Sequence, residues 1–73
     1  MAKTGRILCI YDRLLAGKAV VKREEAARFG VDTRTIQRDL DDIRAYLADV
    51  SHAQCELVYD RRRQGYVIRT QKE

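Results

Sequence analysis

One unbroken apolar stripe runs through residues 33–48. Its members, Ile36, Leu40, Ile43 and Leu47, recur at steps of four, three and four residues, which places them on one face of an α-helix. The opposite side, about 200° around from Ile36 at roughly 100° per residue, is wholly polar. It carries Arg34, Gln37, Arg38 and Asp41. We therefore predict a helix here, with its back in the core and its front exposed.

A second helix is predicted directly before this one, over residues 22–29. Ala26, Gly30 and Ile36 follow one another at steps of four and six residues, which is the spacing of a helix-turn-helix. The alanine is small where the two helices cross, the glycine allows the positive φ of the turn, and Ile36 locks the later helix against the earlier one. Asp32 is a suitable N-cap for the later helix.

The rest of the chain predicts one more helix and a β-hairpin. Residues 6–16 have helical apolar spacing, and a glycine follows where a left-handed C-cap is expected. Residues 19–21 form a short apolar stretch that suits one brief strand. Residues 56–60 and 65–69 are β-branched and aromatic runs separated by polar residues before a glycine, which predicts a hairpin. Residues 49–55 are predicted to form a loop.

This order of elements predicts a single domain over residues 1–73, with its core in about residues 6–69. A two-stranded hairpin is marginal alone, so one of its faces must pack on the helices. We expect a fold of the α+β class, mainly α-helical: a winged helix-turn-helix with three helices and a C-terminal two-stranded wing.

Length and composition exclude several classes of protein. The chain has 73 residues, 45% apolar and 36% charged, which fits one small globular domain. No apolar run approaches the roughly 20 residues that span a bilayer, and the N-terminus lacks the apolar core of a signal peptide. We therefore expect no membrane partner and a cytoplasmic location, or a nuclear one if the source is eukaryotic.

The reactive and metal-binding side chains form no recognisable site. Cys9 and Cys55 are far apart, so in a reducing compartment we expect small apolar side chains rather than a disulfide. His52 is the only histidine and offers no metal-ligand spacing. The sequence contains no catalytic motif, and so small a domain has little room for a substrate pocket. We expect neither an enzyme nor a metal or cofactor site.

The order of charges within residues 33–48 runs against the helix. Arg34 and Arg38 lie near its N-terminal end, where the dipole disfavours cations, and their spacing of four residues lets like charges repel. Residues 33–50 hold three basic against four acidic side chains, so the arginines do not reflect a generally basic segment. Each penalty is a few tenths to about 1 kcal/mol, which a polyanion outside the chain would outweigh.

Duplex DNA is the polyanion that fits this geometry. Its major groove, about 12 Å wide, admits one α-helix, whose N-terminal residues meet the base edges. Arginine pairs with guanine and glutamine with adenine, each worth about 1–3 kcal/mol of discrimination, while threonine hydroxyls suit phosphates. The arginine run at the predicted hairpin tip would reach the backbone or the minor groove. The candidate DNA-binding residues are Thr33, Arg34, Thr35, Gln37, Arg38, Arg61, Arg62 and Arg63.

The acidic residues of the same helix are expected to form ion pairs. Asp42 can pair with Arg38 four residues before it, and Asp41 can pair with Arg44 three residues after it. Asp39 adjoins a core residue, so we expect it to pair with another element.

Three stretches of the sequence resemble one known family. "RTIQRDLDDIRAYL", "RILCIYDRLLAGKAV" and "YDRRRQGYVI" are similar to the N-terminal DNA-binding domain of bacterial WYL-domain transcription regulators, which is related to the DeoR-type winged helix-turn-helix. The resemblance covers roughly residues 6–69 and implies sequence-specific DNA binding at the nucleoid. It matches Arg34, Thr35, Gln37 and Arg38 to the recognition helix and residues 61–63 to the wing. Such regulators usually carry a ligand-sensing domain after the wing, which these 73 residues do not contain, so we expect a stand-alone domain or a fragment.

The sequence also leaves other interpretations open. A winged helix can instead dock on a protein partner, although such a module normally exposes apolar side chains on its third helix. The arginines could be solvated surface charges, and the four tyrosines are expected in core and edge packing rather than base stacking. RNA is disfavoured because a helix cannot read the deep, narrow major groove of its duplex. If the chain binds DNA as a homodimer, its half-sites would lie about one helical turn apart.

Overall fold

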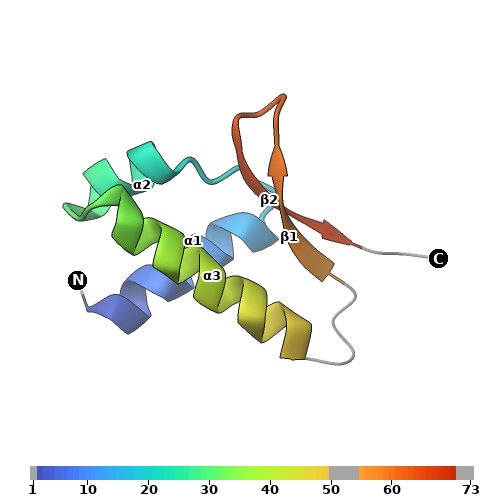
Figure 1. Cartoon of the computed structure of the whole chain (residues 1–73), viewed down its shortest axis with the longest axis horizontal. Coiled ribbons are helices and arrows are strands. Elements are labelled where there is room, and N and C mark those ends of the chain that lie inside the picture. Colours follow the sequence, from blue (N-terminus) through green and yellow to red (C-terminus); the bar gives the residue numbers. More distant parts are fainter. Residues whose placement is uncertain (1, 50–54, 71–73) are drawn as a thin grey trace.

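The computed structural model describes residues 2–49 and 55–70 of the chain. It shows a mainly helical α+β domain in which three helices precede an antiparallel two-stranded sheet (Figure 1). The elements in chain order are α1 (Lys3–Leu15), α2 (Lys22–Phe29), α3 (Thr33–Asp49), β1 (Cys55–Asp60) and β2 (Gly65–Thr70). This arrangement is consistent with a winged-helix fold, and the predicted fold class is confirmed.

The predicted helix bounds hold closely for α2 and α3 and less well for α1. α2 occupies the predicted residues 22–29, and α3 extends one residue past its predicted end. α1 begins at Lys3, three residues earlier than predicted. The reason is that Ala2 is extended and serves as the N-cap, and its carbonyl accepts the Arg6 N–H at 3.0 Å.

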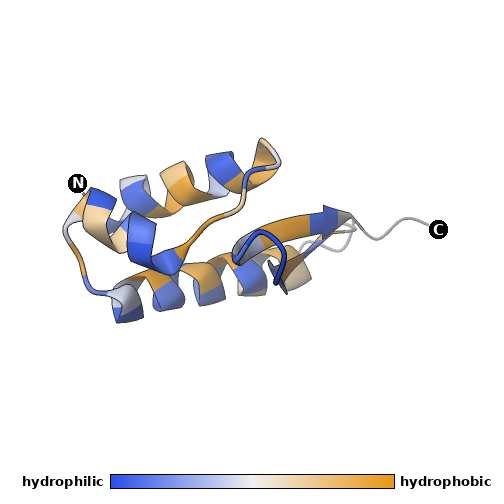
Figure 2. Cartoon of the chain, turned by 90° about the horizontal axis from the view of Figure 1, so that it is seen from above, coloured by the Kyte–Doolittle hydropathy of each residue, from blue (hydrophilic) through white to orange (hydrophobic). Residues whose placement is uncertain are grey.

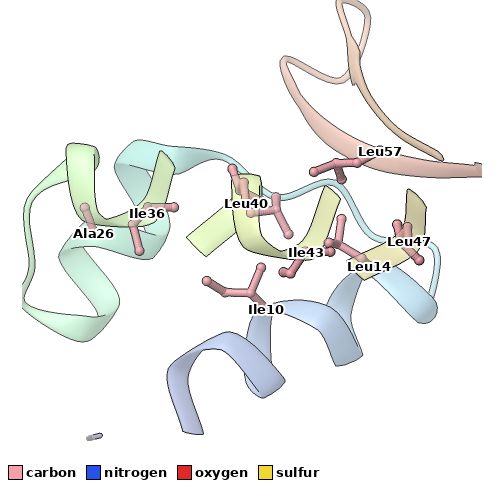
Figure 3. Packing of buried hydrophobic residues seen from close by; sticks show 9 residues of the cluster. Ile10, Leu14, Ala26, Ile36, Leu40, Ile43, Leu47 and Leu57 are labelled. Atoms are coloured by element: carbon pink, nitrogen blue, oxygen red, sulfur yellow. The ribbon is translucent and has the colours of Figure 1, made fainter. Parts of the chain in front are cut away.

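A left-handed glycine makes the short connection between α2 and α3. Gly30 has a φ of 66° and a ψ of 37°, a conformation that costs a residue with a side chain about 1–2 kcal/mol. The Val31 N–H donates to the Ala26 carbonyl at 2.9 Å and closes the turn. Ala26 and Ile36 are buried on the two helices that meet here (Figure 3). The predicted helix-turn-helix is therefore confirmed as an architecture.

The core lies between α1 and α3 and is covered at one end by the hairpin (Figure 3). The apolar stripe of α3 is buried along its whole length. The buried cluster consists of Ile10, Leu14, Val20, Ala26, Ile36, Leu40, Ile43, Leu47 and Leu57. Because a large aliphatic side chain contributes about 1.5–3 kcal/mol when fully buried, this cluster is the main source of apolar stabilisation.

The front of α3 faces away from this core. Figure 2 shows the α3 ribbon hydrophobic on the side toward the rest of the molecule and hydrophilic on the outer side. Arg34, Arg38 and Asp41 are exposed there, as predicted, and Gln37 is half-buried. In the described ranges, no helix combines the length and the apolar character that a membrane-crossing segment requires.

The hairpin strands pair in register along their full lengths. β1 begins at Cys55, inside the predicted loop, and residues 50–54 of that loop lie outside the described residues. Leu57 is buried against the helices, whereas Tyr59, two residues further on, is 54% exposed. The difference arises because the tip of the hairpin extends beyond the helices (Figure 1).

The predicted short strand at residues 19–21 is reduced to a single bridge to β2. The Val20 N–H donates to the Tyr66 carbonyl at 2.8 Å, and the Tyr66 N–H donates to the Val20 carbonyl at the same distance. Gly65 makes this approach possible, because a Cβ there would lie only 2.9 Å from the Val20 carbonyl oxygen. The wing is thereby attached to the connection between α1 and α2.

Candidate nucleic-acid interface

The first half of α3 presents two cations to solvent. Arg34 and Arg38 are exposed, and neither forms an ion pair with another residue that the structure describes. Thr33 is exposed beside them, and Thr35 is half-buried. The helix starts at the predicted cap: Asp32 Oδ1 accepts the Arg34 N–H at 3.4 Å, and the Asp32 carbonyl accepts the Thr35 N–H at 3.0 Å.

Gln37 is held on two sides by other side chains. The Lys22 ammonium, from the start of α2, donates to Gln37 Oε1 at 2.8 Å. Gln37 Nε2 donates to Asp41 Oδ1 at 3.0 Å. Arg44 Nη1 donates to the same carboxylate oxygen at 3.4 Å, which confirms the predicted pair of Asp41 and Arg44. A continuous chain of hydrogen bonds therefore leads from α2 along the side of α3.

Two further aspartates of α3, Asp39 and Asp42, contact residues of α1. Asp42 does not pair with Arg38 as predicted, because a lysine of α1 takes its place: Oδ2 of Asp42 lies 3.8 Å from Nζ of Lys3. Asp39 is fully buried, and both of its oxygens accept hydrogen bonds from Arg6, with Nη2 to Oδ1 at 3.1 Å. This hydrogen-bonded carboxylate raises the pKa of the Arg6 guanidinium. The predicted ion pair to another element is confirmed.

The three arginines at the predicted hairpin tip do not all make the same contacts. Asp60 Oδ1 accepts the backbone N–H groups of Arg62 and Arg63 at 2.9 and 3.3 Å, which closes the turn. Arg61 and Arg62 are exposed. Arg63 is exposed as well, but its Nη2 donates to the Gly17 carbonyl at 2.9 Å. Its guanidinium therefore lies back against the end of α1.

A basic groove separates the hairpin tip from the starts of α2 and α3. It encloses about 540 Å³, and we call it the wing groove. The charged residues that line it are Lys22, Arg23, Glu24, Arg61 and Arg63. Four cations thus face one carboxylate across a space bounded by three separate elements.

The wing groove unites part of the predicted site. It joins Thr33 with Arg61 and Arg63, although the threonine and the arginines are far apart in the sequence. The two arginines on the front of α3 lie outside the groove. Lys22 and Arg23 also line it, and sequence reasoning missed them. The sequence did contain a signal for these two residues: both lie in the first turn of α2, where the helix dipole disfavours cations.

The four tyrosines pack in two edge-to-face pairs. The ring centroids of Tyr11 and Tyr46 are 6.0 Å apart, and those of Tyr59 and Tyr66 are 5.2 Å apart. Burial, and after it the neighbouring Tyr46, raises the pKa of the Tyr11 hydroxyl. Each pair combines one half-buried and one exposed ring, which agrees with the expected core and edge packing.

Among the described residues, the remaining reactive side chains form no common site. Cys9 and Cys55 are free and half-buried. Across residues 2–49 and 55–70, no three potential metal-ligating side chains come together, and His52 lies outside these ranges. Comparisons with protein-family models, curated proteins and solved structures yield no match.

Proposed function

We propose that this domain binds duplex DNA sequence-specifically and acts in bacterial transcription regulation, as its resemblance to WYL-domain regulators implies. The front of α3 enters the major groove, and the wing contacts the neighbouring backbone or minor groove. One observation carries this proposal: Arg34, in the first turn of α3 where the dipole disfavours a cation, and Arg38, one turn later, are both exposed and have no ion-pair partner among the described residues. Phosphates outside the chain are the partner that offsets this arrangement.

The wing groove supports the same proposal. A helix in the major groove is flanked by phosphates, and cations beside it hold the protein in register on the duplex. Lys22, Arg23, Arg61 and Arg63 are placed beside the start of α3 in this way. A single domain with few phosphate contacts binds weakly, so a homodimer on two half-sites would bind more tightly.

A second candidate function is docking on a protein partner. It is favoured by an apolar groove of about 380 Å³ between α1 and α3, lined by Ile7, Leu8, Tyr11, Asp42, Ile43 and Tyr46. Leu8 and Tyr46 are more than half exposed there. This groove lies on the flank of α3, however, and the exposed front of the helix is polar, which favours DNA as its partner.

The DNA proposal is tested by fluorescence anisotropy with a pool of random duplexes at two salt concentrations. The comparison is between the wild type and the double variant Arg34→Ala/Arg38→Ala. We expect wild-type binding to weaken steeply with salt, because each neutralised phosphate contributes about 0.9 to the slope of log K against log salt. The double variant should lose most of this binding.

A matched control removes two cations elsewhere on the surface. Lys3→Ala/Arg69→Ala has the same net charge as the test variant, and both of its positions are exposed and outside the proposed interface. We expect this control to bind nearly as well as the wild type. A folded wild-type protein that binds no duplex at low salt would contradict the proposal and direct attention to the apolar groove between α1 and α3.

A further inference from the structure

The side-chain amide of Gln37 has only one orientation that satisfies its neighbours. The Lys22 ammonium only donates hydrogen bonds, and the Asp41 carboxylate only accepts them. Gln37 Oε1 therefore faces Lys22 at 2.8 Å, and Nε2 faces Asp41 at 3.0 Å. Exchanging the two amide atoms would set donor against donor and acceptor against acceptor. Hydrogen bonding thus fixes a group that rotates freely on most protein surfaces.

Both neighbours of Gln37 are themselves held in place. Lys22 Nζ lies 5.9 Å from the ring centroid of Tyr66, a distance at which a cation is attracted to an aromatic face. Tyr66 belongs to the wing and is bonded through its backbone to Val20. Asp41 accepts a second hydrogen bond from Arg44, one turn further along α3. The orientation of Gln37 therefore depends on contacts with the wing at one end and with α3 at the other.

These contacts leave part of the Gln37 amide available. An amide oxygen has two lone pairs and its NH₂ group has two hydrogens, and the protein uses one of each. The adenine edge in the major groove offers one acceptor, N7, and one donor, the N6 amino group. Guanine offers two acceptors at the same edge, N7 and O6. Its O6 would therefore face the amide oxygen of Gln37, and two acceptors cannot form a hydrogen bond. The remaining capacity of the amide matches adenine and opposes guanine.

We propose that Lys22 and Asp41 are positioning residues that hold the Gln37 amide in the orientation that reads one adenine. This inference rests on the proposed DNA binding and adds a specificity determinant to it. Neither Lys22 nor Asp41 needs to touch a base. Because Lys22 also contacts Tyr66, the wing and α3 are expected to dock on DNA as one unit, with the base contact made by α3.

The first experiment selects bound sequences from the random duplex pool with the wild type and then exchanges each selected base in turn. We expect one adenine whose replacement by guanine lowers affinity about 5- to 150-fold, the range for one good bidentate contact. Gln37→Ala should abolish discrimination at this position. Asp41→Ala and Lys22→Met should each lower it about 2- to 10-fold, as expected for the loss of one hydrogen bond.

Charge and positioning are separated by the overall affinity of the two variants. Asp41→Ala removes a negative charge and should strengthen binding to random duplexes, whereas Lys22→Met removes a positive charge and should weaken it. Discrimination at the adenine should fall in both. Asp42→Ala is the matched control, since it removes a neighbouring carboxylate that contacts Lys3 rather than Gln37. It should strengthen random binding and leave discrimination unchanged.

A measurement on the free protein tests the fixed amide directly. In the wild-type NMR spectrum, the two side-chain amide protons of Gln37 should have chemical shifts that differ from those of a solvated glutamine. These shifts should move toward the solvated values in Asp41→Ala and in Lys22→Met. Unchanged resonances, or full adenine discrimination in both variants, would overturn the positioning role. Equal wild-type affinity for all sequences would overturn it while leaving DNA binding intact. No wild-type binding to any duplex would overturn the proposed function and this inference together.

Discussion

Three aspartates within four positions of α3 have three different roles. Asp39 is buried and binds Arg6, Asp41 orients Gln37 at the edge of the front, and Asp42 faces Lys3 on the opposite flank. Each step along a helix rotates the side chain by about 100°, so neighbouring acids meet different partners. The role of each carboxylate follows from its angular position relative to the core stripe rather than from its chemical type.

Of these three aspartates, the buried Asp39 should cause the largest loss of stability when it is substituted. Asp39→Ala leaves the Arg6 guanidinium without its carboxylate in a buried site, and breaking a buried pair in this way costs about 3–5 kcal/mol. A domain of this size has a total stability of only about 4–11 kcal/mol. We therefore expect Asp39→Ala to shift the urea midpoint strongly downward or to unfold the domain, measured by circular dichroism.

Asp42→Ala serves as the comparison for that substitution. It breaks an exposed pair with Lys3, which is worth less than about 1 kcal/mol. The urea midpoint of Asp42→Ala should therefore stay close to that of the wild type. Similar losses in the two variants would show that the buried pair between α1 and α3 contributes no more than a surface contact.

At the scale of elements, one close approach attaches the wing to the connection between α1 and α2. β2 pairs with this connection through the backbones of Val20 and Tyr66. A Cβ at Gly65 would lie 2.9 Å from the Val20 carbonyl oxygen and 3.1 Å from its carbonyl carbon. Both contacts are with backbone, so no flexible side chain can move aside to relieve them.

Gly65→Ala is therefore expected to open the bridge between the wing and the helices. Hydrogen exchange at the Val20 and Tyr66 amides should accelerate by roughly tenfold or more, since each lost hydrogen bond contributes about 0.5–1.5 kcal/mol. Gly17→Ala is an informative control, because Gly17 has a φ of 82° but open space around its Cβ position. It should lower stability through backbone strain while the two amides keep their relative protection. Unchanged exchange in Gly65→Ala would contradict this account of wing attachment.

The elements themselves could be predicted from the sequence because their signals are local. Apolar periodicity marked α3, and Gly30 ended α2 at the predicted residue. The Asp41–Arg44 pair could also be predicted, because both members lie on one helix. The predicted pair of Asp42 with Arg38 was wrong, because a lysine from α1 competes for the carboxylate. Periodicity cannot reveal which distant partner a long polar side chain meets.

In the candidate site, too, contacts between residues far apart in the sequence could not be predicted. Arg63 was predicted as part of a projecting wing, yet it bonds to a carbonyl 46 residues earlier in the chain. Lys22 contacts Gln37 across 15 positions and was not predicted at all. Both contacts depend on how the hairpin and α2 pack against the core. This packing is a property of the whole domain and cannot be deduced from any short segment.

At the scale of the whole molecule, a basic groove and an apolar groove lie on different elements. The cations of the wing groove lie between the hairpin and the starts of α2 and α3, together with the exposed ring of Tyr59. The exposed side chains of Leu8 and Tyr46 lie on the flank between α1 and α3. Two different surfaces are therefore available to two kinds of partner. The proposed DNA surface combines groups that would read bases with groups that would only neutralise phosphates.

The wing and the recognition helix should differ in what their arginines contribute. Arg61→Ala/Arg62→Ala removes two cations from the tip, where contacts with the phosphate backbone are expected. Binding should weaken about equally on all duplexes, and the slope of log K against log salt should fall by about 1.8, or 0.9 for each lost contact. Arg34→Ala/Arg38→Ala removes the same charge from α3 and should also flatten the sequence preference. If the wing variant alters base preference as much as the helix variant does, the wing reads bases, and the division of labour between the two elements is wrong.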